Sequence, residues 1–235
     1  MTSSRYALYF TPAPGSALAR FGAAVLGYDG DEASAVPRLP LTGLDADAVA
    51  AATAEPGRYG FHATIAAPFR LAPDRTETGL VSALETFAGR PPVSVGRLRP
   101  ALLSRFMALV PCDRSPAIAA LAEDCVRAFD PFRAPLSPTD RQRRETSGLS
   151  ARQIELLDRW GYAYVLDEFR FHMTLAGPLP EADRRRWQTA CDAAFAALAH
   201  AEVVFDALSL VRQDRPEARF RVVRRQPFAS ATGPT

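Results

Sequence analysis

The sequence predicts an α+β fold in which a duplicated unit forms two antiparallel sheets that face each other across a central cleft, with helices on the outside. Two observations predict this fold. The segments Gly60–Phe69 (GFHATIAAPF) and Arg170–Leu179 (RFHMTLAGPL) match at five positions. Each is followed by the same predicted order of helix, strand and strand. The repeat indicates two similar lobes, and we expect the matched strands to line the cleft.

The first lobe is predicted over residues 1–112, and caps and apolar alternation delimit its elements. Ahead of the first matched segment we expect a strand over Arg5–Thr11, a helix over Ser16–Leu26 ended by Gly27, and a polar, proline-containing stretch up to about Gly57. After that segment we expect a helix over Thr76–Phe87 and strands over Val93–Leu103 and Phe106–Val110.

The second lobe is predicted over residues 113–228, so that a single bilobal domain covers residues 1–228. Before the second matched segment we expect a helix over Ser115–Phe129, a loop over Asp130–Asp140, a basic run at Arg141–Arg144 and a helix over Ala151–Trp160. After it we expect a helix over Glu181–Ala199 and strands over Val203–Val211 and Arg219–Arg224. Small and polar residues at 229–235 predict a disordered tail.

Composition excludes several classes of function. All 28 basic residues are arginine, so lysine-adenylate, P-loop and Schiff-base chemistry are excluded together. A formal net charge of +2 indicates no dominant attraction to long nucleic acid or to an anionic membrane. Three cysteines without a matching histidine pattern favour free thiols. With no signal peptide or membrane span evident, we expect a cytoplasmic protein without an obligate protein partner.

The matched segments alternate in the way that half-buried strands do. In the first, Phe61, Ala63 and Ile65 face one side, while His62 and Thr64 face the other. The second segment repeats this pattern, with His172 and Thr174 on its polar face. Each strand therefore presents an imidazole and a hydroxyl together.

Paired His-x-Thr-aliphatic motifs, 110 positions apart in a duplicated α+β frame, resemble the two-histidine phosphoesterase superfamily. That superfamily includes 2′-5′ RNA ligase-like proteins and cyclic phosphodiesterases. The surroundings RYGFHAT, WGYAY and FRFHMTL resemble most closely its branch associated with phosphonate metabolism. The resemblance extends from about Arg5 to about Arg225, and it implies a phosphorylated ribose cyclic phosphate as the substrate.

The same residues indicate acid–base chemistry without the resemblance. Hydrolysis of a phosphodiester needs a base for the water proton and an acid for the leaving oxygen, and His62 and His172 can fill both roles near neutral pH. Thr64 and Thr174 can donate hydrogen bonds to the phosphoryl oxygens. A metal site is the alternative, but the same strand faces offer too few further ligands. We therefore predict a metal-independent reaction with no cofactor.

Other residues are candidates for substrate binding. Arg170 lies two residues before His172, so alternation predicts it on the same strand face, within reach of a phosphate. The remaining candidates are an aromatic residue and three arginines of the middle segment, with packing or solvated surface as the alternative for each: Tyr59, Arg133, Arg143 and Arg144. His200 ends a predicted helix and is assigned no chemistry.

These features predict an enzyme that hydrolyses a small cyclic phosphodiester of a sugar or nucleotide. The alternative enzyme acts on RNA ends, as a 2′,3′-cyclic phosphodiesterase or a 2′-5′ ligase. A third hypothesis is a non-catalytic module that binds a nucleotide or RNA. Because the two matched segments are so alike, the sequence leaves open which histidine is the base.

Overall fold

The computed structural model describes residues 4–145 and 148–229. The tail expected over 229–235 lies outside these residues except for Ala229. The helices and strands in chain order are β1 (Arg5–Phe10), α1 (Ala17–Leu26), β2 (Tyr28–Asp29), β3 (Ser34–Ala35), α2 (Ala46–Ala54), β4 (Ala63–Phe69), α3 (Glu77–Phe87), β5 (Val93–Leu103), β6 (Phe106–Pro111), α4 (Pro116–Phe129), α5 (Pro138–Arg144), α6 (Ala151–Trp160), β7 (Met173–Ala176), α7 (Arg184–Phe195), β8 (Glu202–Phe205), β9 (Ala207–Gln213) and β10 (Arg221–Pro227).

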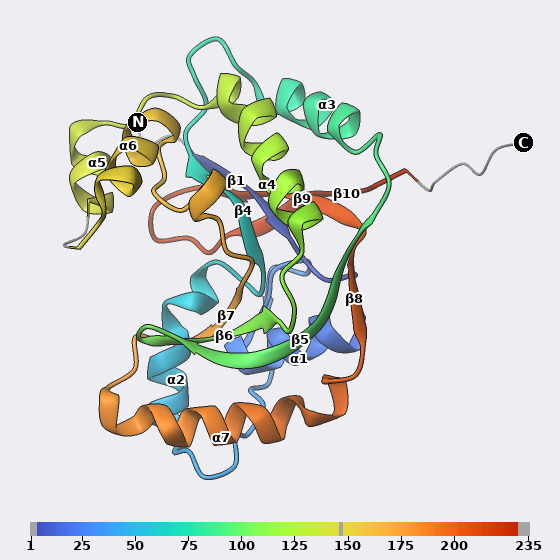
Figure 1. Ribbon diagram of the computed structural model, residues 1–235, viewed down its shortest axis with the longest axis vertical. Helices are drawn as coiled ribbons and strands as arrows, with labels where there is room; N and C mark the ends of the chain where they lie inside the picture. The colour runs from blue at the N-terminus through green and yellow to red at the C-terminus, as the bar shows by residue number, and fades with distance from the viewer. Residues whose placement is uncertain (1–3, 146–147, 230–235) are drawn as a thin grey trace, which may run out of the picture.

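Eight of the strands form one curled antiparallel sheet in the order β10-β9-β1-β4-β7-β6-β5-β8 (Figure 1). The short strands β2 and β3 form a separate hairpin. The predicted α+β class is confirmed. The two sheets that we expected are two four-stranded halves of this sheet, and they join where β4 pairs with β7 through Ala63 and Met173.

The halves of the sheet do not follow the halves of the chain. The first contains β1 and β4 with β9 and β10, and the second contains β5 and β6 with β7 and β8. Each thus takes two strands from before residue 113 and two from after it. The expected lobes, residues 1–112 and 113–228, therefore do not coincide with the halves of the sheet, because strand pairing exchanges partners between the two repeats.

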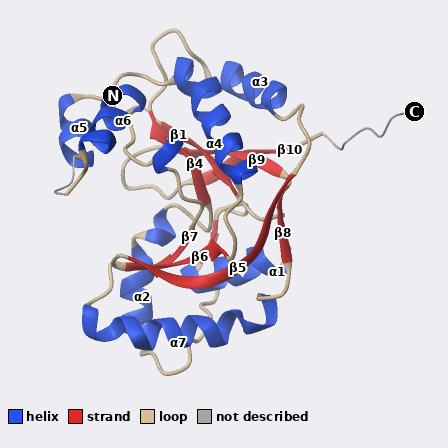
Figure 2. Cartoon of the chain, in the orientation of Figure 1, coloured by secondary structure: helices blue, strands red, loops and turns tan. Residues whose placement is uncertain are grey.

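Helices flank both halves of the sheet (Figure 2). In the first half, α3 packs against β9 and β10, and α4 packs against β4. In the second half, α7 packs against β5, while α1 and α2 pack against β7. Among the residues that the structure describes, no helix has both the length and the hydropathy that crossing a membrane would require.

Most predicted elements are present with bounds close to those expected. For α1, the Ser16 hydroxyl caps the first turn and Gly27 ends the helix in the left-handed conformation. Helix α2 lies in the polar, proline-containing stretch, where the Asp45 side chain accepts from two backbone amides and starts the helix. Helix α5 likewise interrupts the expected loop over Asp130–Asp140 and includes the whole basic run.

The strand expected over Val203–Val211 is two strands. Asp206 separates β8 from β9, and the chain changes partners at that point. Strand β8 pairs with β5 in one half of the sheet, whereas β9 pairs with β1 and β10 in the other. Alternation along the chain reveals strand-forming residues but not the partner of each strand, so this split was not predictable.

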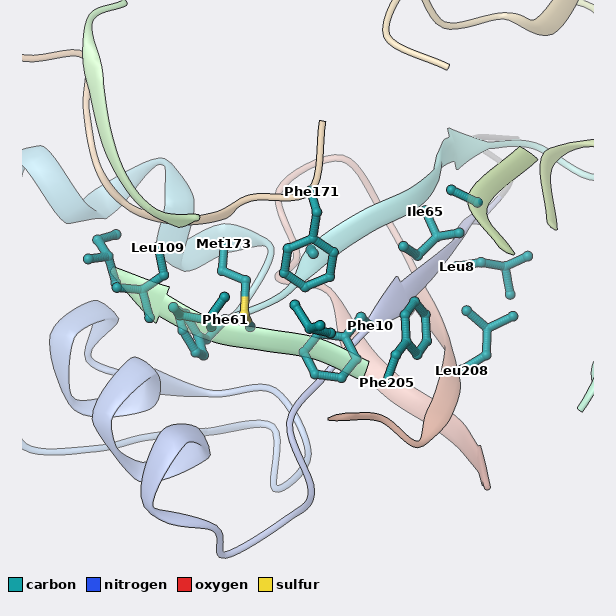
Figure 3. Packing of buried hydrophobic residues seen from close by; sticks show 14 of the residues in the cluster. Leu8, Phe10, Phe61, Ile65, Leu109, Phe171, Met173, Phe205 and Leu208 are labelled. Carbon is teal, nitrogen blue, oxygen red and sulfur yellow. The ribbon is translucent and has the colours of Figure 1, made fainter. Parts of the chain in front are cut away.

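The main core is built from the apolar face of both matched strands. Phe61, Ala63 and Ile65 are buried, as are Phe171, Met173 and Leu175, and this confirms the alternation that the sequence predicted. Aromatic rings join the strands across the core (Figure 3): the ring centroid of Phe10 lies 5.6 Å from that of Phe171 and 4.9 Å from that of Phe205.

Helix α1 contacts this core through a glycine, which gives a first prediction. A Cβ atom at Gly22 would lie 1.9 Å from Cδ1 of Phe61, so Gly22→Ala must displace the ring that precedes His62. The cost of overpacking should exceed the roughly 1 kcal/mol by which alanine stabilises a helix relative to glycine. We therefore expect the free energy of unfolding to fall by about 2 kcal/mol. Urea denaturation measures this change.

Gly79→Ala is the matched control. Gly79 is also helical, in α3, but a Cβ there would meet only ordinary contacts at 3.4 and 3.6 Å. We expect this variant to be as stable as the wild type or more stable, by up to about 1 kcal/mol. Equal effects of the two substitutions would contradict the packing of α1 on Phe61.

Candidate active site

The junction of β4 and β7 brings the two histidines together. Ala63 and Met173 are directly paired in antiparallel register. Continuing that register by one residue in each direction sets His62 opposite Thr174 and Thr64 opposite His172, on the face away from the core. All four side chains line one cleft. The duplicated motif therefore forms a crossed arrangement of two imidazoles and two hydroxyls.

His62 is fixed by its immediate neighbours in the chain. Its Nδ1–H donates to the carbonyl of Gly60 at 2.8 Å, and its Nε2 lies 3.1 Å from Thr64 Oγ1. Gly60 has a φ of 76°, a conformation that favours glycine. The ring of Tyr9 stacks on the imidazole with a centroid distance of 3.7 Å and an interplanar angle of 19°. Nε2 is thus the nitrogen without a backbone partner, and the Thr64 hydroxyl lies beside it.

His172 is held in the corresponding way. Its Nδ1–H donates to the carbonyl of Arg170 at 2.8 Å. The ring of Phe106, from β6, lies 5.5 Å from the imidazole. In both histidines a backbone carbonyl two residues earlier selects the tautomer with hydrogen on Nδ1, so each neutral ring presents an unprotonated Nε2.

Burial keeps both imidazoles neutral. Desolvation lowers the pKa of His62 from the ordinary 6.5 to about 4, the bond to Gly60 opposes this shift, and the nearby His172 adds to it. Desolvation also lowers the pKa of His172, again against its backbone hydrogen bond. In the free protein at pH 7 both rings are therefore neutral.

The cleft around the histidines measures about 850 Å³, which is in the range of small-molecule sites. Arginines dominate its walls, and Glu55 is the sole carboxylate among the described residues that line it. The lining arginines are Arg5, Arg58, Arg70, Arg105, Arg143, Arg144 and Arg215. The walls of the cleft therefore carry an excess of positive charge.

Three predicted binding residues line this cleft. Tyr59 stacks on Phe220 at a centroid distance of 5.3 Å and lines the cleft. Arg143 and Arg144 come from α5 and lie at the end of the cleft that is next to the C-terminal end of β4. Arg143 is bonded to Asp140, with Nη2 and Oδ1 2.7 Å apart.

The structure places two other predicted binding residues elsewhere. Arg170 is exposed and does not line the cleft, although its carbonyl holds His172. Strand β7 begins only at Met173, so alternation does not extend back to Arg170. Arg133 is half-buried and paired with Asp130, with Nη2 and Oδ1 2.9 Å apart, and its Nη2 also donates to the carbonyl of Arg159. The structure thus places both side chains outside the cleft walls.

Sequence reasoning missed several residues of the cleft, notably Arg5, Tyr9 and Tyr162. Tyr9 faces the cleft because it pairs with Thr64 across β1 and β4. Its chain position alone gave no signal, since Tyr9 lies in an apolar strand of aromatic residues. Only the pairing of β1 with β4 identifies which aromatic residue meets the histidine.

Within residues 4–145 and 148–229, no three or more His, Cys, Asp or Glu side chains gather in a way that could hold a metal ion. His200, to which we assigned no chemistry, is exposed and is absent from the cleft walls.

A family model described as a protein of unknown function, DUF1045, matches residues 64–221. The chain belongs to the DUF1045 family. The match covers β4 through the start of β10, which includes the second His-x-Thr segment and the arginines of α5. DUF1045 is the phosphonate-associated, two-histidine phosphoesterase-like family, so the match confirms the resemblance found in the sequence.

Two curated relatives of this DUF1045 chain are called ribose 1,5-bisphosphate phosphokinase PhnN. The one from Janthinobacterium sp. (strain Marseille) is 38% identical over 231 residues, which is 96% of this chain and 51% of the relative. The one from Laribacter hongkongensis (strain HLHK9) is 37% identical over 222 residues, 94% of this chain and 51% of the relative. The chain therefore spans about half the length of the curated relatives it matches.

Among solved structures, one described as a crystal structure of phosphoesterase aligns with 97% of this DUF1045 chain and 99% of its own chain. The sequence identity is 13% and the TM-score is 0.42.

Proposed function

We propose that this chain is a metal-independent phosphoesterase that opens a small cyclic phosphodiester by acid–base catalysis. The observation that carries the proposal is the crossed pair of imidazoles at the β4–β7 junction, each with Nδ1 tied to a carbonyl and Nε2 left for chemistry. General acid and general base catalysis each contribute about 10²–10⁴-fold to a rate.

We assign His62 as the base and His172 as the acid. His62 is neutral at pH 7 because its pKa is lowered to about 4, and its Nε2 is ready to accept a proton from water. Repulsion from His172 further disfavours a charge on His62. A bound phosphate anion raises the pKa of a nearby imidazole, so His172 takes up the proton that the leaving oxygen requires.

The reaction then balances as the addition of one water molecule. The water oxygen bonds to phosphorus while its proton passes to Nε2 of His62. The bond from phosphorus to one ring oxygen breaks, and that oxygen takes the proton from Nε2 of His172. In the free protein the Thr64 hydroxyl donates to Nε2 of His62. On substrate binding the attacking water takes that place at Nε2, and the hydroxyls of Thr64 and Thr174 donate to the non-bridging oxygens as their charge develops.

The relatives suggest which cyclic ester is opened. They are named for phosphorylation of ribose 1,5-bisphosphate, and this chain corresponds to half of each. Since the chain contains no lysine, it lacks the P-loop lysine that grips nucleotide phosphates in many kinases. We propose that it acts on ribose 5-phosphate 1,2-cyclic phosphate with O2 as the leaving oxygen, because that reaction yields ribose 1,5-bisphosphate.

The test is ring opening followed by phosphorus NMR in the presence of EDTA. The panel is ribose 5-phosphate 1,2-cyclic phosphate, 2′,3′-cyclic nucleotides and an oligonucleotide with a cyclic phosphate end. We expect the sugar phosphate to be opened fastest, to ribose 1,5-bisphosphate, at the same rate with and without EDTA. Loss of activity in EDTA, or release of the 2-phosphate isomer, would contradict the mechanism.

The basic cleft also suits an RNA end, which keeps the RNA phosphodiesterase or ligase as the second candidate. Preference for the oligonucleotide in the same panel would favour it. Failure to open any of the three substrates would instead favour a binding module without turnover.

A further inference from the structure

Arg144, the last residue of α5, forms no ion pair with a carboxylate of the described residues. Its Nη1 donates to the carbonyl of Gly161 and its Nη2 to the carbonyl of Pro68. Within the part of the chain that the structure describes, no carboxylate oxygen lies within 4.0 Å of this guanidinium. Partial burial lowers its pKa, although Tyr162 and Asp140 oppose the shift. A desolvated cation without a counterion favours an anionic ligand.

The neighbours of Arg144 supply further donors and little negative charge. The Nε of Arg5 donates to Gln213 at 2.8 Å, which leaves its outer nitrogens for a ligand. Arg70 and Arg143 share a single carboxylate, that of Asp140. Four cleft-lining guanidiniums at this end of the cleft thus face one acidic side chain.

Two tyrosine hydroxyls belong to the same region. Tyr9 is 1% exposed, and its hydroxyl has no hydrogen-bond partner among the described residues. Burial raises the pKa of Tyr9, whereas the positive charges of Arg5 and Arg144 act in the opposite direction. Burial also raises the pKa of Tyr162, to about 12. Both phenols therefore remain protonated donors, and the buried hydroxyl of Tyr9 lacks an acceptor.

The position of Pro68 along β4 sets the distance between Arg144 and the two histidines. Pro68, whose carbonyl holds Arg144, follows Thr64 by four residues on the same strand. At about 3.3 Å per residue, the two positions lie roughly 13 Å apart. Tyr9 lies between the two ends, because its ring stacks on His62 while the charge of Arg144 acts on its hydroxyl.

We propose that Arg144, with Arg5 and the hydroxyls of Tyr9 and Tyr162, forms a second anion subsite that binds a terminal phosphomonoester of the substrate. Given the proposed function, on which this identification of the ligand rests, that group is the 5-phosphate of the ribose. Arg144 uses two of its five N–H groups in hydrogen bonds to backbone carbonyls, so three remain for the phosphate oxygens. A substrate with a free 5-hydroxyl would leave this guanidinium uncompensated, so the subsite selects phosphorylated sugars.

Paired substrates test the subsite. We expect wild-type kcat/KM for ribose 5-phosphate 1,2-cyclic phosphate to exceed that for ribose 1,2-cyclic phosphate by about 100-fold, the range expected for a buried charge pair. In Arg144→Gln this ratio should fall to within a few-fold of one, and Arg144→Lys should restore part of it. A ratio in Arg144→Gln equal to that of the wild type would overturn the proposal.

Two further variants separate binding from damage to the fold. Tyr9→Phe keeps the ring that stacks on His62 but removes the hydroxyl, and we expect the ratio to fall by about 5- to 10-fold. Arg99 is exposed on β5 and does not line the cleft, so Arg99→Gln should keep the wild-type ratio. An unchanged ratio in Tyr9→Phe would remove its hydroxyl from the subsite.

Calorimetry with ribose 5-phosphate makes the test independent of turnover. We expect the wild type to bind ribose 5-phosphate but not ribose, and Arg144→Gln to bind it at least about 10-fold more weakly. If this holds while no cyclic ester is opened, the subsite stands and the proposed function fails. If cyclic esters are opened equally with and without a 5-phosphate, the function stands and the subsite fails.

Discussion

Replacing either His62 or His172 with glutamine is expected to lower kcat by about 10²–10⁴-fold, because each variant loses one of the two proton transfers. Glutamine can donate to the same carbonyl that each imidazole Nδ1–H meets, those of Gly60 and Arg170, so the local backbone should be preserved. Turnover of ribose 5-phosphate 1,2-cyclic phosphate under saturating conditions measures the effect.

His200→Gln is the matched control, since His200 is exposed and lies outside the cleft. It should retain the wild-type kcat. Far-ultraviolet circular dichroism and the urea midpoint show whether each variant is folded. The two-histidine mechanism is wrong if a folded His62→Gln or His172→Gln protein keeps more than a tenth of the wild-type kcat.

The protein should lose stability as the pH falls from 6.5 to 4, and His62 should cause a large part of this loss. In the unfolded chain His62 titrates near 6.5, whereas in the folded protein its pKa is about 4. Above pH 6.5 neither state binds the proton, so the full stability is present. Between these values the unfolded state binds more protons, and about 3 kcal/mol is lost by the time the pH reaches 4.

Urea denaturation of wild type and His62→Gln at pH 7.5 and at pH 4 isolates this contribution. Carboxylates titrate in the same range in both proteins, so their effect cancels in the difference. We expect the wild type to lose about 3 kcal/mol more than the variant between the two pH values. Equal losses would show that His62 is not held neutral by burial.

The sequence by itself determined the local features of the fold. Three local features follow from residues close together in the chain, and all were predicted: the apolar and polar faces of both matched strands, the end of α1 at Gly27 and the bounds of α6. Alternation also places an imidazole and a hydroxyl on one face of each strand. These signals are strong because strand and helix periodicity depend on neighbouring residues.

Only the tertiary structure decided how these parts meet. Pairing of β1 with β4 brings Tyr9 onto His62, and packing of α5 beside β4 places Arg144 in the cleft while Arg170, closer to His172 in the chain, remains outside it. The local sequence pattern likewise does not reveal that each half of the sheet takes strands from both repeats. The physical reason is that strand partners and helix positions are set by long-range burial of apolar surface, which the order of residues along one strand does not encode.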